Sequence, residues 1–304
     1  MKILSLGLSG PAEEIRSRLQ QDCQNIGLEG FRIAIDETIK GHFTFLGCNI
    51  AEGELSFRNY ERVKNMLKAC VARSLAEMII THEEKALVRK MINQDYGYFS
   101  EAEQNTIYTN AIKILDSGSL SDFSYGARRD QVLSRLQEYL AVHQELVLEG
   151  FIAFRLKDYR DRLAEIVGKA VDEYMMDLEY KEFIRVLRYF VDVQETQVDE
   201  VHVVVSDDDA FKIRDASGNS ISNQYLETFS ARSGEDINYE DLLISALITI
   251  APQTIMLHLA AAAPLSNIFQ TIQGVFAGRV ILCSGCDICQ RDERERKAPD
   301  TERN

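Results

Sequence analysis

The sequence has few cysteines, no signal-peptide pattern and no excess of positive charge. Six cysteines in 304 residues are too few for a secreted protein held together by disulfides. The opening MKILSLGLSGPAEE has only a short apolar run, and acidic residues follow it directly. We therefore expect a cytoplasmic protein with reduced thiols. The 48 acidic residues outnumber the 34 basic ones, and this net charge of −14 argues against binding to nucleic acid, whose phosphates attract positive surfaces.

The sequence also lacks the short motifs of common enzyme classes. It contains no G-x-x-x-x-G-K-[ST] phosphate loop, no G-x-G-x-x-G dinucleotide motif and no G-x-S-x-G nucleophile turn. The segment THEEK contains His82 but not the second histidine of a zinc protease motif. We therefore predict no catalytic residues and favour a protein that is not an enzyme.

One long segment without charge raises the question of a membrane. Residues 242–278 contain no Asp, Glu, Lys or Arg, and a membrane-spanning helix needs about 20 apolar residues. Pro252, His258 and Pro264 divide this segment into pieces with the length of ordinary helices and strands. We favour a buried core over membrane attachment, and an anchor within residues 242–265 is the alternative.

The hydrophobic periodicity divides the chain into four regions and predicts an α+β fold. Residues 1–56 combine an apolar strand, a helix and a hairpin around the Lys-Gly pair at 40–41, which indicates a small N-terminal α/β unit. Residues 57–194 follow a helical period and predict a helical middle region. Residues 195–289 return to a strand pattern and predict a C-terminal α/β unit, and the charged residues 290–304 predict a disordered tail.

The C-terminal α/β unit is predicted to contain a βαβ element. The segments TIMLHL, residues 254–259, and RVILC, residues 279–283, have the composition of strands. Between them, a helix is predicted from Pro264 to Gly278, because proline favours the first turn of a helix and glycine its end. Two strands joined in this way are normally parallel, so their carboxyl ends share one edge of the sheet. His258 and Cys283 are therefore expected at that edge.

Three cysteines near this edge are the clearest chemical signal of the sequence. Cys283, Cys286 and Cys289 follow the spacing C-x2-C-x2-C, and Gly285 permits the sharp turn needed to wrap a metal ion. Because a structural zinc site is four-coordinate, His258 is the candidate fourth ligand. Zinc and an iron–sulfur cluster are both considered, although the fourth cysteine of the bacterial ferredoxin motif is missing after Cys289.

Two other interpretations of the cysteines remain open. A metal-dependent or thiol redox enzyme would use them for catalysis, with Cys286 and Cys289 cycling between dithiol and disulfide. Thioredoxin-like chemistry places C-x-x-C at the start of a helix, whereas a charged segment follows here. The third interpretation is that the cysteines are small, partly buried side chains that bind no metal.

The C-terminal segment LLISALITIAPQTIMLHLAAAAPLSNIFQTIQGVFAGRVILCSGCDIC resembles the end of the YtxC-like proteins of endospore-forming bacteria. The resemblance rests on the apolar run into TIAP, the strand with His258, the TIQGVFAGRV join and the three cysteines. The order of regions, with a hairpin around DDDAFKIRDASGNSI, also fits this family. The resemblance implies a sporulation-associated protein with no assigned reaction. We therefore expect a non-enzymatic cytosolic protein that binds a protein partner.

Overall fold

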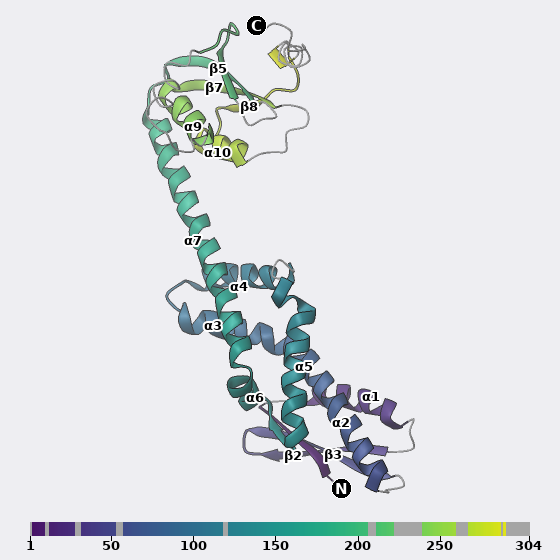
Figure 1. Cartoon of the computed structure of the whole chain (residues 1–304). Helices are drawn as coiled ribbons and strands as arrows, with labels where there is room; N and C mark the ends of the chain where they lie inside the picture. Colours follow the sequence, from purple (N-terminus) through teal and green to yellow (C-terminus); the bar gives the residue numbers. More distant parts are fainter. Residues whose placement is uncertain are drawn as a thin grey trace. The chain divides into compact units, whose positions relative to one another are not determined.

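The computed structural model describes most of the chain, whose course is shown in Figure 1. The described residues are 2–9, 12–27, 32–52, 57–117, 121–205, 211–221, 239–259, 267–286 and 288–289. They form two compact units, Met1–Met176 and Asp177–Asn304, and each unit contains a four-stranded sheet. Helices occupy most of the sequence between the two sheets, so the predicted α+β fold is confirmed. The tail predicted at 290–304 lies outside the described residues.

The sheet of the first unit has the strand order β2-β3-β1-β4. Its strands are β1 (Lys2–Ser9), β2 (Arg32–Lys40), β3 (Phe43–Glu52) and β4 (Glu145–Val147). Strands β2 and β3 form the predicted hairpin, and β1 lies antiparallel to β3. Strand β4 pairs parallel to β1. The sequence pattern does not predict β4, because three residues are too short to show an alternation of apolar and polar positions.

The remaining elements of the first unit are helical. They are α1 (Glu13–Gly27), α2 (Phe57–Met78), the π-helical turn η1 (Ile79–Glu83), α3 (Glu84–Asp95), α4 (Glu101–Asp116), the 3-10 turn η2 (Ser121–Phe123), α5 (Tyr125–Val142), α6 (Leu148–Arg155) and the first part of α7 (Lys157–Val193). The apolar stripe of α2 is buried as its period predicts, with Leu67, Val71 and Leu75 at most 1% exposed. Such stripes, together with buried apolar residues of β1 and β3, form the core of this unit.

The sheet of the second unit has the strand order β6-β5-β7-β8. Its strands are β5 (Val198–Val205), β6 (Phe211–Asp215), β7 (Pro252–Leu259) and β8 (Val280–Leu282). Strand β6 is antiparallel to β5, whereas β5–β7 and β7–β8 are parallel pairs. The helices of this unit are α9 (Tyr239–Ile250), α10 (Asn267–Val275) and the second part of α7. The unit β7–α10–β8 confirms the predicted βαβ element.

Strand alternation divides the second sheet into an apolar core face and a face that carries polar groups. Val201 and Val203 of β5 and Ile255 and Leu257 of β7 belong to one core cluster with residues of α9 and α10, which lie beside the sheet in Figure 1. Because successive side chains of a strand point to opposite faces, His202 and His258 lie on the other face. This alternation places both histidines outside the apolar core while keeping them buried.

The uncharged segment, residues 242–278, is divided among α9, β7 and α10. Helix α9 has 12 residues and β7 has 8, and residues 260–266 lie outside the described part. Across the described residues, no helix is both long enough and apolar enough to cross a membrane.

Candidate metal centre

The βαβ element brings His258 and Cys283 together. Leu257 and Leu282 are register partners in the parallel pair of β7 and β8, and the N–H of Cys283 donates to the carbonyl of Leu257 over 2.9 Å. His258 and Cys283 each follow directly on this pair. The chain then turns at Gly285, whose φ of 123° is readily adopted only by glycine. This turn carries the chain back to Cys286 and Cys289.

The four predicted ligand residues converge on one point. The ligand atoms of His258, Cys283, Cys286 and Cys289, named here the Cys–His cluster, all lie within 4.8 Å of one another. The Sγ atom of Cys289 is 3.8 Å from that of Cys283 and 3.9 Å from that of Cys286. The Nδ1 atom of His258 is 3.6 Å from the Cys286 sulfur and 3.2 Å from the Cys289 sulfur.

These separations resemble the edges of a tetrahedron around one metal ion. Zinc–sulfur bonds of about 2.3 Å at the tetrahedral angle place two sulfurs about 3.8 Å apart, and a zinc-bound nitrogen lies about 3.6 Å from each sulfur. Both sulfur–sulfur distances and the distance from His258 to Cys286 agree with these values. The distance from His258 to Cys289, 3.2 Å, is shorter. The arrangement can therefore accept a tetrahedral ion with small side-chain movements.

Backbone N–H groups support negative charge on part of the cluster. The N–H of Gly285 donates to the Cys283 sulfur over 3.3 Å. Partial burial opposes ionisation of Cys286, but the N–H groups of Cys289 and Ile288 donate to its sulfur, and on balance its pKa is lowered. Burial and the neighbouring thiols raise the pKa of Cys289 to about 11. Three thiolates at this spacing repel one another, and a bound cation relieves that repulsion.

His258 is suited to act as a neutral ligand. Its side chain is 2% exposed, and burial together with the nearby His202 ring lowers its pKa. The ring is therefore uncharged at neutral pH, as a metal-binding imidazole must be. Its Nδ1 atom faces the cysteines, while its Nε2 atom lies 2.8 Å from Nδ1 of His202. The Nε2 atom of His202 in turn lies 2.9 Å from a carboxylate oxygen of Glu200.

Glu200 and His202 are the residues that the sequence analysis missed. They occupy alternate positions of β5, so they share one face, and β5 pairs with β7 next to His258. The available signal was this alternation in VDEVHVVV, which places a glutamate and a histidine on the same side of a strand. It was insufficient because the pairing of β5 with β7 joins segments about 50 residues apart in the chain.

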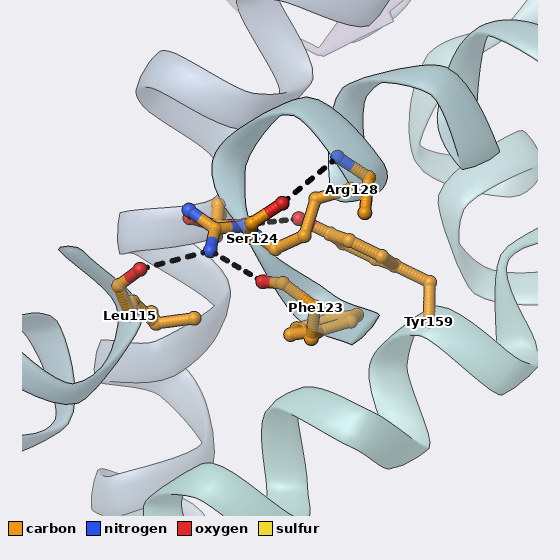
Figure 2. Close-up of polar contacts among 7 residues, drawn as sticks. Leu115, Phe123, Ser124, Arg128 and Tyr159 are labelled. Carbon is orange, nitrogen blue, oxygen red and sulfur yellow. Dashed lines mark hydrogen bonds and ion pairs between the residues drawn. The ribbon is translucent and has the colours of Figure 1, made fainter. Parts of the chain in front are cut away.

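The first unit contains a second concentration of polar side chains, formed by Glu84, Arg128 and Tyr159. Nε of Arg128 is 2.9 Å from a carboxylate oxygen of Glu84, and the Tyr159 hydroxyl donates to the same oxygen. The Arg128 guanidinium also donates to the carbonyl oxygens of Leu115 and Phe123 over 3.0 Å each, as Figure 2 shows. Burial raises the pKa of Glu84 despite these partners. We interpret this group as an internal tie between α3, α5 and α7.

Comparison with known proteins places the chain among relatives of unassigned function. The profile of the YtxC-like family matches residues 69–281, which is more than half of the chain. The chain belongs to the YtxC-like family. It is 27% identical over 212 residues to the uncharacterized protein YtxC of Bacillus subtilis (strain 168), an alignment that covers 68% of this chain and 73% of that protein. No solved structure matches the chain.

The range of the family match bears on the Cys–His cluster. The matched residues include His258, but they end at residue 281, before Cys283. The three cysteines that contributed to the resemblance therefore lie outside the matched residues. The case for a metal in this YtxC-like protein rests on the geometry of the cluster.

Proposed function

We propose that this YtxC-like protein binds one zinc ion through Nδ1 of His258 and the sulfurs of Cys283, Cys286 and Cys289. The observation that supports the proposal is the convergence of these four ligand atoms within 4.8 Å. Thiolate and imidazole ligands in a tetrahedral set are those that zinc prefers. The local sequence favours this arrangement, because the parallel strands position two ligands and the turn at Gly285 returns the other two.

The compactness of the cluster favours a single ion over an iron–sulfur cluster. Ligands of an iron–sulfur cluster attach to different iron atoms, so some of their donor atoms are farther apart than the edges of one tetrahedron. Here the closest approaches between sulfurs, 3.8 and 3.9 Å, match those edges. Zinc is therefore the cofactor that we propose.

A four-ligand set also favours a structural role over a catalytic one. Catalytic zinc sites have three protein ligands and leave one position for water or substrate, whereas structural sites are closed by four. With His258 and the three cysteines as ligands, zinc would fasten the turn after β8 to the end of β7. We therefore propose a non-enzymatic cytoplasmic protein in which zinc holds the end of the second sheet in a defined shape.

Metal analysis of the full chain, purified without oxygen, tests the zinc site. We expect about one zinc per chain, and loss of most of it in Cys286→Ser. Cys70→Ser is the matched control, because Cys70 is a partly buried cysteine of the first unit and should leave the zinc content unchanged. Equal zinc in wild type and Cys286→Ser would refute the proposal. Iron bound together with sulfide would support an iron–sulfur cluster in place of zinc. A metal-free protein with a reversible Cys286–Cys289 disulfide would support redox chemistry.

We propose further that the protein acts during sporulation by binding a protein partner. The support for this setting is membership of the YtxC-like family together with the resemblance of the C-terminal segment to the YtxC-like proteins of endospore-forming bacteria. Deleting the gene in an endospore-forming host should lower the yield of heat-resistant spores while leaving vegetative growth unchanged, and Cys286→Ser should restore the yield less than wild type. An unchanged spore yield after deletion would contradict the sporulation role.

A further inference from the structure

The His258 ring uses its two nitrogens in opposite directions. Nδ1 faces the sulfurs of Cys286 and Cys289, and Nε2 faces Nδ1 of His202 at 2.8 Å. The other nitrogen of His202 lies 2.9 Å from the Glu200 carboxylate. A continuous line of polar contacts therefore runs from Glu200 through His202 and His258 into the Cys–His cluster.

The sheet register explains why these three side chains meet. In the parallel pair of β5 and β7, His202 is opposite Met256 and Val204 is opposite His258. His202 and His258 are therefore diagonal neighbours on the same face, within reach of each other's rings. Their rings are stacked with centroids 5.1 Å apart, and His202 is itself buried. Hydrogen bonds between buried groups are stronger than hydrogen bonds in water, so this contact can hold the ring of His258 in place.

The Glu200 carboxylate sets the direction of the hydrogen bonds. A carboxylate only accepts, so a neutral His202 must carry its hydrogen on Nε2 and leave Nδ1 bare. Bare Nδ1 of His202 then accepts from Nε2–H of His258, which leaves Nδ1 of His258 without a hydrogen. That nitrogen is the one that faces the cysteines. If each neutral ring carried its hydrogen on the other nitrogen, an unprotonated nitrogen of His202 would face the Glu200 carboxylate, and two hydrogen-bond acceptors would meet.

We propose that Glu200 and His202 are positioning residues of the zinc centre, which fix the orientation of His258 and leave its Nδ1 free to bind the metal. This inference rests on the proposed zinc function. Partners of this kind orient a metal-bound histidine and increase its basicity, and their loss typically weakens metal binding by 10- to 100-fold. The line of contacts extends the centre from β7 and β8 to β5.

Competition between the full chain and a chromophoric zinc chelator measures the contribution of His202. We expect His202→Leu to weaken zinc binding about 10- to 100-fold, because leucine cannot accept the hydrogen of His258. His202→Asn should bind more tightly than His202→Leu, because its amide oxygen can accept from a position close to Nδ1. Glu200→Gln should have the smallest effect, because an amide oxygen still accepts from His202 but carries no charge.

Two further measurements separate positioning from general damage to the sheet. Val204→Ala is the matched control, because Val204 is buried on the same face of β5 beside His258 but has no side-chain atom that can hydrogen-bond to it. It should change zinc affinity less than threefold. Nitrogen NMR of histidine-labelled, zinc-loaded protein should show His258 with its hydrogen on Nε2 in wild type and in His202→Asn. Circular dichroism shows whether each variant is folded.

The outcomes distinguish this inference from the zinc function itself. If Cys286→Ser loses zinc while His202→Leu binds it as tightly as wild type, zinc binding stands and the positioning role is wrong. If Val204→Ala weakens binding as much as His202→Leu, or if His202→Asn gives no recovery, the effect is one of packing and the inference is also wrong. A wild-type protein that binds no zinc would overturn both.

Discussion

The two polar clusters of the molecule, one in each unit, differ in where their positive charge comes from. In the first unit, the guanidinium of Arg128 lies against the carboxylate of Glu84, and the Tyr159 hydroxyl and two backbone carbonyls complete the group. In the second unit, the described contacts of the Cys–His cluster are with electron-pair donors and backbone N–H groups. In the first cluster the chain itself supplies the cation, whereas the second has the composition of a site for an added cation.

This comparison shows why burial and a perturbed pKa do not by themselves indicate a functional site. Glu84 is more deeply buried than the cysteines and its pKa is raised, yet both of its carboxylate oxygens already contact Arg128, and one also accepts from Tyr159. The cysteines are only half-buried, but their lone pairs converge on one point. Convergence of several electron-pair donors on one point is the feature that distinguishes the candidate metal centre.

The largest expected effect comes from removing the internal cation of the first unit. Arg128→Met should lower the free energy of unfolding of that unit by about 3–5 kcal/mol, because it leaves the Glu84 charge buried without its cation. Denaturant unfolding, followed by a probe in α5, measures the loss. The zinc content should not change.

The double variant Glu84→Gln/Arg128→Met tests the reason for that effect. It removes both charges, so it should be less destabilised than the sum of the two single variants. Additive losses would mean that the two side chains act independently, and the interpretation of Glu84 and Arg128 as a coupled ion pair would then be wrong.

A smaller effect is expected from removing the proposed external cation of the second unit. Zinc at 100 times its Kd should stabilise the unit that binds it by about 2.7 kcal/mol, and a chelator should abolish this stabilisation. Hydrogen exchange should become faster in β7 and β8 after chelation and remain unchanged in α5. Cys286→Ser should show no response to the chelator. Faster exchange in both units would contradict the view that only one cluster needs a metal.

The candidate metal centre could largely be predicted from the sequence, because three of its ligands form a regular motif and the fourth lies on the preceding strand of the same βαβ element. The spacing of Cys283, Cys286 and Cys289 is local, and the preference for parallel strands in a βαβ element brings His258 to Cys283. The apolar period of each segment likewise predicts the α+β fold. These inferences need no knowledge of how distant strands are ordered within a sheet.

The parts that could not be predicted depend on pairing between distant segments. The position of His202 beside His258 follows from β5 lying next to β7, and local periodicity does not specify that neighbour. Glu84, Arg128 and Tyr159 come from three different helices, where a charged residue usually indicates a solvated face. Only Tyr159 carried a signal, since it lies on the apolar stripe of α7 and its buried hydroxyl needs a partner.

The smallest expected effect is a difference in the sign of the pH response of the two clusters. Because burial raises the pKa of Glu84, the folded first unit holds the Glu84 proton more tightly than the unfolded chain does. This contribution to stability is present below the ordinary glutamate pKa of 4.5 and is lost as the pH rises through the raised value. Glu84→Gln should remove that part of the pH dependence from denaturant unfolding curves.

The Cys–His cluster should respond in the opposite direction. The thiol of Cys289, with a pKa of about 11, must lose its proton to bind zinc, so zinc affinity should rise by about tenfold per pH unit for each proton released near neutral pH. Calorimetric titration with zinc in buffers of different ionisation enthalpy counts these protons. For wild type, we expect release of at least one proton for each zinc ion bound. Zinc binding that releases no proton would show that Cys289 is not a ligand, and the proposed four-ligand site would then be wrong.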